Sequence, residues 1–287
     1  MFEIKDKNDK RVQRENIDEI KIIFTDLDGT LLNDENKISD LNLQSLIKAK
    51  NKGIKIVISS GRTILSVERI IGKYIKKSNL NLLPGIYLNG STTFNSSGSL
   101  LIDAVIDNNL KMEINDFTKK LNISEYSVWY SSDRTYCFSM NDEIQRLSEI
   151  EGMTPEIISE EELKNLGVYK VAFCLNKNNL ESILDLSKKK LLNKVNVVNT
   201  FKNYIELYHQ NINKFEGIKK ICNLYNISLN NALAIGDGEN DIEMLNGLPY
   251  SVSVSNASDK VKRCAKYNGP SNNEDALAHV LHAFCDI

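Results

Sequence analysis

The chain alternates short β-branched runs with longer stretches of helical periodicity, and this alternation limits the folds open to it. The run Ile20–Thr25 predicts a buried strand, and Leu41–Lys52 predicts a helix that ends at Gly53. Ile54–Ser59 predicts the next strand, and Thr63–Lys77 predicts the next helix. Strand–helix–strand units of this kind place parallel strands in one sheet with helices on both faces. We therefore predict an α/β fold with a doubly wound, Rossmann-like parallel sheet.

The alternation is interrupted in the middle of the chain. After about Asp107 a predicted helix precedes two strand-like runs, and more helices and strands of a different spacing follow. The original alternation returns with the strands Leu233–Ile235 and Ser251–Val254 and closes with the helix Asp275–Phe284. An insertion of about a hundred residues is within the usual size of a domain. We therefore predict a polar N-terminal arm over residues 1–17. An α/β core in two segments, 18–106 and 207–287, follows it, and an α/β module over residues 107–206 is inserted between these segments.

The composition is that of a globular protein, with 41% hydrophobic and 26% charged residues. The net charge of −2 gives no electrostatic reason to expect nucleic acid or an anionic membrane as a partner. No stretch approaches the roughly 18 apolar residues of a bilayer span, and the charged stretch Lys5–Glu15 lacks the apolar run of a secretory signal. Five separated cysteines without a CxxC pair indicate reduced thiols. We therefore expect a cytoplasmic protein.

Two motifs follow the first two predicted strands. The first strand ends in Asp26 and Asp28, two carboxylates two positions apart and followed by a glycine. Ligands of open α/β sheets bind beyond the carboxyl ends of the strands, so these side chains are expected to open onto that crevice. By itself, such an acidic pair is more often a solvated turn. The second strand ends in Ser60 and Gly61, where a hydroxyl and a backbone amide at a helix start can hold a phosphate or serve as an ordinary helix cap.

Two further motifs lie in the last third of the chain. Lys214 stands near a helix start after a strand, and by itself it is uninformative among the 36 Lys and Arg residues. The segment Gly236–Asp241 is a glycine-flanked acidic cluster between a predicted strand and a predicted helix. An EF-hand is excluded, because Ile242 and Leu248 stand where its loop needs glycine and glutamate. Oxygen ligands around a strand end suit Mg²⁺ instead, which completes its shell with water and phosphate.

Taken in this order, the four motifs resemble those of haloacid dehalogenase-superfamily phosphatases, and most of all those of the Cof-type, class IIB branch. The resemblance covers residues 18–287 and leaves the N-terminal arm outside it. An insertion between the second and third motifs is also as in that branch, where it is a C2-type cap that sets substrate specificity. The resemblance implies a Mg²⁺-dependent phosphatase that works through an aspartyl-phosphate.

The resemblance also implies a role for each matching residue. Asp26 is the nucleophile, and Asp28 is the general acid and base that also binds the metal through its backbone carbonyl. Asp241 either supports the site or reaches the metal through water. The implied metal ligands are Asp26, Asp28, Asp237 and Asp241, and the implied phosphate-binding residues are Leu27, Ser60, Gly61, Lys214 and Asn240. Two positions depart from the family pattern: Ser60 replaces the usual threonine, and Phe215 follows Lys214 where glycine is common, which leaves the geometry of that loop open.

The chemistry of phosphate transfer explains these residue types independently. A carboxylate that attacks a phosphate dianion meets like-charge repulsion, which Mg²⁺ and Lys214 would offset while they stabilise the transition state. Asp26 would form the aspartyl-phosphate and so divide one difficult displacement into two. Asp28 would protonate the leaving alkoxide and then deprotonate the attacking water.

We predict the hydrolysis of small phosphorylated metabolites, and of sugar monophosphates above all. Two alternatives remain open: a phosphomannomutase-like phosphomutase of the same superfamily, and a non-catalytic metabolite sensor on this scaffold. The phosphomutase would need basic cap residues for a second phosphate, and the only arginines of the insertion are Arg134 and Arg146, although lysines are plentiful. The intact Asp26 and Lys214 argue against the sensor, because sensing alone does not need the nucleophile.

Overall fold

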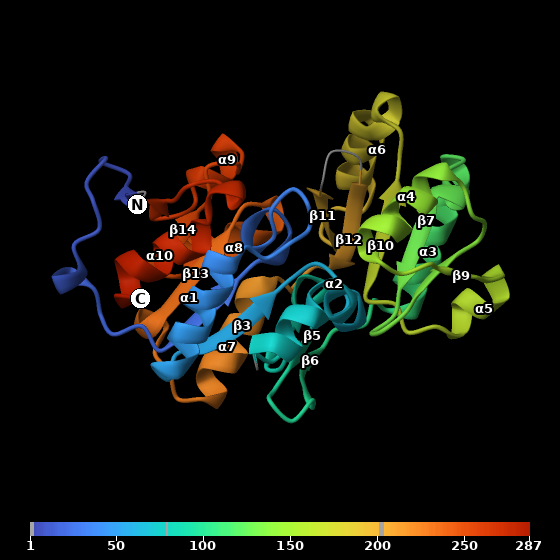
Figure 1. Ribbon diagram of the computed structural model, residues 1–287. Coiled ribbons are helices and arrows are strands. Elements are labelled where there is room, and N and C mark those ends of the chain that lie inside the picture. Colours follow the sequence, from blue (N-terminus) through green and yellow to red (C-terminus); the bar gives the residue numbers. More distant parts are fainter. Residues whose placement is uncertain (1–2, 79, 201–203) are drawn as a thin grey trace. The chain divides into compact units, whose positions relative to one another are not determined.

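The computed structural model describes residues 3–78, 80–200 and 204–287, and its chain divides into two units (Figure 1). The first unit takes in residues 1–60, 71–102 and 213–287, and the second takes in residues 61–70 and 103–212. Helix α2 (Ile64–Ser78) therefore begins in the second unit and ends in the first. The predicted arm and the predicted insertion each include positions outside the described ranges, namely residues 1–2 and 201–203.

A nine-stranded sheet forms the centre of the first unit. Its strands are β1 Lys5–Asp6, β2 Ile22–Thr25, β3 Lys55–Ser59, β4 Gly85–Tyr87, β5 Thr92–Phe94, β6 Leu100–Asp103, β13 Ala232–Gly236, β14 Tyr250–Ser253 and β15 Tyr267–Asn268. Their order is β1-β15-β14-β13-β2-β3-β4-β5-β6, and the strands from β15 to β4 pair in parallel. All four residues of β2 are buried, as expected for a strand covered on both faces. The predicted doubly wound α/β fold is confirmed.

Helices cover both faces of this sheet (Figure 1). The helices that lie wholly in the first unit are α1 Asp40–Asn51, α7 Lys214–Leu224, α8 Ile242–Gly247, α9 Asp259–Lys262 and α10 Ala276–Cys285. Helix α1 packs against α10, and α7 packs against α8. Side chains alternate along β2, so Ile22 and Phe24 join a core cluster with Ile218 of α7 and Met244 of α8, while Ile23 points to the opposite face. The buried strand is thus held between two helical layers.

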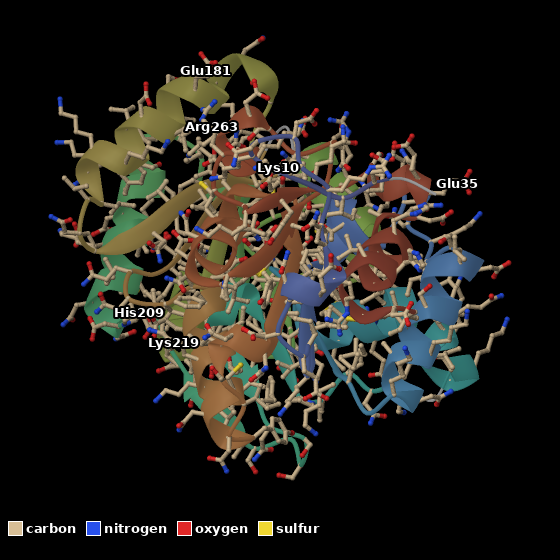
Figure 2. The ribbon with its side chains drawn as sticks, turned by 90° about the vertical axis from the view of Figure 1, so that its left-hand side faces the viewer. Lys10, Glu35, Glu181, His209, Lys219 and Arg263 are labelled. Carbon is tan, nitrogen blue, oxygen red and sulfur yellow. The ribbon has the colours of Figure 1, made fainter. Side chains whose placement is uncertain are left out.

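The described part of the N-terminal arm contributes an edge strand to the sheet. Strand β1 pairs antiparallel with β15, and Ile4 beside it is 3% exposed. The Nζ of Lys7 donates a hydrogen bond to the carbonyl oxygen of Arg263 at 2.6 Å. Lys10 of the arm and Arg263, both exposed, are labelled in Figure 2. A polar segment can join the sheet in this way because strand pairing uses backbone groups that every residue carries.

The second unit contains a six-stranded sheet with the strands β7 Ser127–Tyr130, β8 Thr135–Cys137, β9 Glu156–Ile157, β10 Lys170–Cys174, β11 Val195–Thr200 and β12 Tyr204–His209. Their order is β11-β12-β10-β7-β8-β9, and the described strands pair antiparallel except β8 with β9. The accompanying helices are α3 Asn108–Lys120, α4 Asp142–Glu151, α5 Glu160–Asn165 and α6 Lys177–Lys190. Trp129, Phe173 and Leu207 pack with Ile114 of α3 and Ile183 of α6 in one core cluster. Within the described residues, every helix is too short or too polar to cross a membrane.

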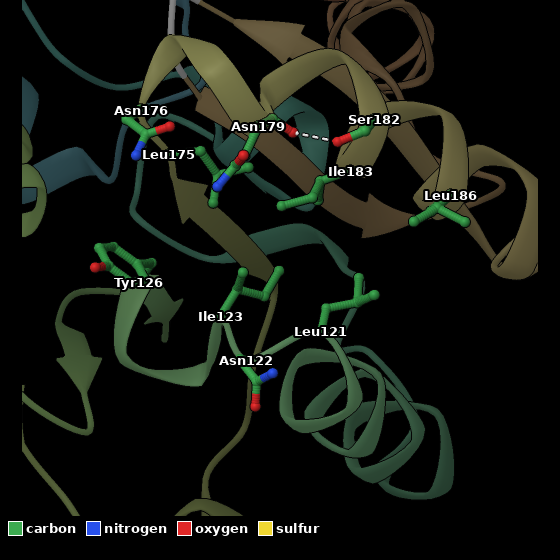
Figure 3. Close-up of a pocket in the computed structure, with 10 residues that line it drawn as sticks. All are labelled: Leu121, Asn122, Ile123, Tyr126, Leu175, Asn176, Asn179, Ser182, Ile183 and Leu186. Carbon is green, nitrogen blue, oxygen red and sulfur yellow. Dashed lines mark hydrogen bonds between the residues drawn. The ribbon is translucent and has the colours of Figure 1, made fainter.

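A cavity of about 440 Å³ opens on the second unit (Figure 3). It lies between the residues that follow α3 and the first half of α6, and the Oγ of Ser182 donates a hydrogen bond to the carbonyl oxygen of Asn179 at its wall, at 3.0 Å. None of its lining residues is one of the predicted site residues; they are Leu121, Asn122, Ile123, Tyr126, Leu175, Asn176, Asn179, Ser182, Ile183 and Leu186.

The predicted boundaries of the longer elements agree closely with the structure. The helix predicted over Leu41–Lys52 is α1, which begins one residue earlier, after Ser39 accepts a capping hydrogen bond from the N–H of Asn42. In the turn after β5, the side chain of Asn95 accepts two backbone hydrogen bonds. The short elements β1, β9, β15 and α9 were not predicted, because two to four residues carry no readable periodicity.

Candidate active site

Three neighbouring strands of the first unit end at the same edge of the sheet. Asp26 follows β2 directly, Ser60 follows β3, and Asp237 follows β13. Strand β2 lies between β3 and β13 and pairs in parallel with both. Because the carboxyl ends of parallel strands meet at one edge, the structure brings these residues together where ligands bind in open α/β sheets.

A buried ion-pair network centres on Lys214, the first residue of α7. Its Nζ donates hydrogen bonds to Oδ1 of Asp26 and to Oδ1 of Asp241, both at 2.6 Å. The side chain of Lys214 is 0% exposed, and that of Asp26 is 8% exposed. The side chain of Asn213 caps the helix by accepting a hydrogen bond from the N–H of Glu216 at 3.0 Å, so the helix begins at the lysine. The residue that was least informative in the sequence thus lies beside the predicted nucleophile.

Asp241 connects Lys214 to the loop that carries Asp237. Its Oδ1 accepts from Lys214, and its Oδ2 accepts from the N–H groups of Asp237 and Gly238, both at 2.9 Å. A Cβ added at Gly236 would lie 2.6 Å from Cγ of Asp241, so only glycine leaves room for this carboxylate. Both oxygens of Asp241 have partners within the protein. This favours the supporting role among the two roles that the resemblance left open.

Asp237 is held by the turn that follows the predicted nucleophile. The Oγ1 of Thr30 donates a hydrogen bond to Oδ1 of Asp237 at 2.8 Å. Gly29 has a φ of +74°, and a Cβ added there would lie 2.5 Å from Oδ2 of Asp237. Sequence reasoning gave neither Gly29 nor Thr30 a role of its own. The signal that could have identified both is their position directly after Asp28.

The pKa values of the cluster reflect its burial and its crowded negative charge. Burial raises the pKa of the Asp26 carboxyl well above its ordinary value, although the attraction of Lys214 opposes this. Repulsion by Asp241, Asp237 and Asp28 raises the pKa of Asp26 further. Burial and the charge of Asp241 also raise the pKa of Asp237 to about 7. Burial disfavours the charged form of Lys214, but the attraction of Asp241 and Asp26 outweighs it and holds the pKa of the lysine above its ordinary value. Four carboxylates around one ammonium leave an excess of negative charge.

This excess charge and the chemistry of the donor atoms fit a divalent cation. Carboxylate oxygens of Asp26, Asp237 and Asp241 all lie within 4.8 Å of one another. Hard oxygen donors suit Mg²⁺, which binds through one or two carboxylates and keeps several waters. Because the oxygens of Asp241 already accept hydrogen bonds, Asp26 and Asp237 are the better candidates for direct ligands. Asp28 is half-buried, and its predicted metal contact is a backbone carbonyl outside this carboxylate group.

The predicted phosphate-binding residues of the first unit surround the same strand ends. Leu27 and Ser60 are buried, and Asn240 is half-buried in the turn after β13. The Nδ2 of Asn240 donates a hydrogen bond to Oδ1 of Asn89 at 2.9 Å, and the N–H of Asn89 donates to the carbonyl oxygen of Ser60 at 3.1 Å. Asn89 was missed from the sequence. Its signal is the Asn-Gly pair that begins two positions after the last residue of β4.

Gly61 follows Ser60 in the chain but belongs to the second unit, where it contacts a buried lysine. Lys170 of β10 is fully buried, and its Nζ donates to the carbonyl oxygen of Gly61 at 2.8 Å and to Oε1 of Glu206 at 2.7 Å. The same Nζ lies 4.0 Å from the ring centroid of Tyr130. These contacts hold the backbone of Gly61 through its carbonyl group.

Phe215 stands where the family pattern led us to expect glycine. Helix α7 nevertheless begins regularly at Lys214, which still reaches Asp26. The ring of Phe215 packs against Gly247, where an added Cβ would lie 2.5 Å from two ring carbons. The small residue at the end of α8 thus makes room for the large ring, and the departure does not displace the lysine.

Comparison with known proteins identifies the family. The family model of haloacid dehalogenase-like hydrolases matches residues 23–281. A Bacillus subtilis protein named 5-amino-6-(5-phospho-D-ribitylamino)uracil phosphatase is 31% identical over 272 residues, which cover 94% of this chain and 97% of that protein. The structure of a HAD/COF-like hydrolase from Plasmodium vivax superposes with a TM-score of 0.87 at 27% identity, over 92% of this chain and 95% of that one.

A solved sugar phosphatase of haloacid dehalogenase subclass IIB shares the fold, with a TM-score of 0.81 at 21% identity over 93% of this chain and 100% of that one. The family match runs through all four sequence motifs and the insertion between them. These findings confirm the resemblance inferred from Asp26, Ser60, Lys214 and Asp237. The chain belongs to the family of haloacid dehalogenase-like hydrolases, as a phosphatase of the Cof type.

Proposed function

We propose that this chain is a Mg²⁺-dependent phosphatase that hydrolyses small phosphorylated metabolites, sugar monophosphates in particular, through an aspartyl-phosphate on Asp26. One observation carries the proposal: the buried carboxylate of Asp26 lies 2.6 Å from the ammonium of Lys214 and beside the carboxylates of Asp237 and Asp241. A carboxylate that must attack a phosphate dianion needs this positive charge next to it. The surrounding carboxylates supply the ligands for more positive charge.

In the first half-reaction an oxygen of Asp26 attacks phosphorus, and the ester P–O bond breaks. Lys214 offsets the charge on the phosphoryl oxygens, while Ser60 and Asn240 hold those oxygens by hydrogen bonds. Asp28, in its protonated form, gives its proton to the leaving alkoxide. Bound Mg²⁺ would supply further positive charge against the repulsion between carboxylate and phosphate. The alcohol departs, and an aspartyl-phosphate remains on Asp26.

In the second half-reaction the ionised Asp28 takes a proton from a water molecule. The water oxygen attacks phosphorus, and the bond between phosphorus and the Asp26 oxygen breaks. This releases inorganic phosphate and restores the carboxylate of Asp26 and the proton of Asp28, so the site is ready for the next substrate.

We assign the choice of substrate to the inserted module, residues 107–206, as a C2-type cap. In this mechanism the residues of the four motifs contact the phosphoryl group, which is the same in every ester, so discrimination needs another part of the chain. A sugar-like ester is supported by the 31% identical Bacillus subtilis relative, whose named substrate carries its phosphate on a ribityl chain, a reduced sugar. The same relative favours a phosphorylated ribitylaminouracil as a second candidate substrate.

The phosphomutase and the sensor differ from the phosphatase in their products. A phosphomutase would move phosphate between two positions of one sugar without releasing it, and a sensor would bind the ester without turnover. We place the reaction in the cytoplasm, since four of the five free cysteines are buried thiols, which suit a reducing compartment.

The experiment that tests the proposal is a release assay for inorganic phosphate with Mg²⁺ present. The panel contains hexose and pentose monophosphates, the ribitylaminouracil phosphate, a phosphopeptide and a generic aryl phosphate. Release of phosphate from sugar or ribityl esters at higher kcat/KM than from the phosphopeptide is the expected result. Isomerised sugar phosphate without release would establish the phosphomutase, and binding without any turnover would establish the sensor.

A further inference from the structure

The turn after β4 has an unusual, left-handed backbone conformation. Leu88, Asn89 and Gly90 follow one another with positive φ angles of 48°, 57° and 99°. Residues other than glycine rarely adopt this left-handed region, and two in succession are unusual. All three residues are buried. Such strain persists where the surrounding structure requires it, and it is frequent at functional sites.

The contacts of Asn89 supply the reason. Its backbone N–H donates a hydrogen bond to the carbonyl oxygen of Ser60 at 3.1 Å. Its side-chain Oδ1 accepts a hydrogen bond from Nδ2 of Asn240 at 2.9 Å. Asn89 is 0% exposed, so both contacts are shielded from water. One buried residue therefore joins two residues that we assign to the phosphoryl group. It makes both contacts from a left-handed backbone conformation.

The amide of Asn240 is confined from its other side by Gly238. A Cβ added at Gly238 would collide with Oδ1 of Asn240. An amide nitrogen carries two N–H groups, and Asn89 accepts from one of them. Asn240 is half-buried, so the residue is not sealed off from solvent.

We propose that Asn89 is a positioning residue for phosphate binding: it turns the amide of Asn240 so that the other N–H of Nδ2 faces a phosphoryl oxygen. The inference rests on the proposed function, because it assigns to Asn89 the orientation of a phosphate-binding side chain. Asn89 lies outside the four family motifs. It follows the strand β4, to which the sequence analysis assigned no functional residue.

Two substitutions separate this role from the strained backbone. Both Asn89→Gly and Asn89→Ala remove the side-chain acceptor, but glycine accepts a φ of 57° without steric cost and alanine does not. We expect both variants to raise the inhibition constant of inorganic phosphate, and the KM for a generic aryl phosphate, about five- to tenfold, the effect of one lost hydrogen bond. The melting temperature should fall for alanine and change less for glycine. Asn226→Gly is the matched control, since Asn226 is exposed and has a φ of 53°; its inhibition constant should equal that of the wild type.

A double-mutant cycle tests whether Asn89 acts through Asn240. In an Asn240→Ala background, Asn89→Gly should raise the inhibition constant less than twofold further, because the group it orients is absent. A further five- to tenfold loss in that background overturns the proposal. So does an unchanged inhibition constant in Asn89→Gly, or a loss confined to the less stable alanine variant.

Phosphate binding by titration calorimetry keeps this test independent of the proposed function. If the wild-type chain hydrolyses no phosphate ester, the proposed function fails, but the affinity of the same variants for inorganic phosphate still decides the role of Asn89. If the wild type is active and the variants bind phosphate like the wild type, the inference about Asn89 fails alone.

Discussion

Replacing Asp241 by Asn is a direct test of the ion-pair network in the site. Asp241 is fully buried and accepts three hydrogen bonds, one from Nζ of Lys214 at 2.6 Å and two from the N–H groups of Asp237 and Gly238 at 2.9 Å. Asparagine keeps the shape of the side chain but has an acceptor on one side only. Its NH₂ group must face either the lysine or the two backbone N–H groups, so donors oppose donors in both orientations.

The expected loss of stability follows from the hydrogen bonds and the ion pair that the substitution removes. A hydrogen bond to a charged group contributes about 1.5–3 kcal/mol, and breaking a buried ion pair costs about 3–5 kcal/mol. We expect the free energy of unfolding to fall by about 3–5 kcal/mol in Asp241→Asn. At about 2–4 °C per kcal/mol, the melting temperature should fall by about 6–20 °C. The kcat should fall as well, because Lys214 loses one of the two carboxylates that hold it.

Thermal and urea unfolding followed by circular dichroism measure this loss. Chelator is added to both proteins, so that a change in metal affinity does not contribute to the difference. The matched control is Asp185→Asn, because Asp185 is exposed on α6; it should melt like the wild type. If Asp241→Asn melts within about 2 °C of the wild type, the contacts of this carboxylate do not stabilise the fold and the reasoning is refuted.

The remaining predictions concern the proposed metal, the two carboxylates proposed to be catalytic and the proposed cap. Chelation should abolish hydrolysis of an aryl phosphate and Mg²⁺ should restore it, whereas Ca²⁺ should not, because its longer bonds would misplace the nucleophile; full activity in excess chelator contradicts the metal requirement. Asp26→Asn should show neither turnover nor covalent phosphate by mass spectrometry, while Asp28→Asn should slow both half-reactions and accumulate phosphoenzyme with a good leaving group; near-native turnover of Asp26→Asn is the contrary result. The pKa of Asp237 is raised from 3.8 to about 7 in the folded protein. Between these pH values the folded protein therefore binds more protons than the unfolded chain, so the stability of the metal-free protein should fall as the pH rises from about 4 to 7. Calorimetric melting should therefore show a larger stabilisation by Mg²⁺ at pH 8 than at pH 5, and equal stabilisation would count against this explanation. Replacing residues 107–206 by a short linker should leave weak aryl-phosphate hydrolysis but equalise the kcat/KM values for different sugar phosphates, and an unchanged ranking would show that the cap does not set specificity.

The main strands and helices of the α/β core were predictable from the sequence, because they depend on patterns that lie within a few residues. The apolar run before Asp26 forms β2, and Gly53 ends α1 with a φ of +82°, as a glycine after a helix commonly does. The four motifs were predictable for a related reason. Each one follows a predicted strand or begins a predicted helix, so its position in an open parallel sheet follows from topology.

The contacts within the site were not predictable, because they join residues far apart in the chain. Lys214 and Asp26 are 188 residues apart, and Asn240 and Asn89 are 151 residues apart. These residues come into contact because of the packing of α7 and the order of the strands β4, β3, β2 and β13. No local sequence pattern predicts that packing or that order. The same limit applies to the N-terminal arm, where a polar segment became an edge strand through pairing with β15.

The sequence by itself determined the fold class, the family and the residue types to which we assign the chemistry. Periodicity and turn residues act over short distances, and each motif is a short run of residues that can be recognised without the rest of the fold. Only the tertiary structure decided that the two oxygens of Asp241 accept hydrogen bonds from Lys214 and from the loop after β13. The same is true of the hydrogen bond that Asn89 accepts from Asn240. The physical reason is that a buried hydrogen bond depends on the direction and desolvation of both partners, and these are set only when distant segments pack together.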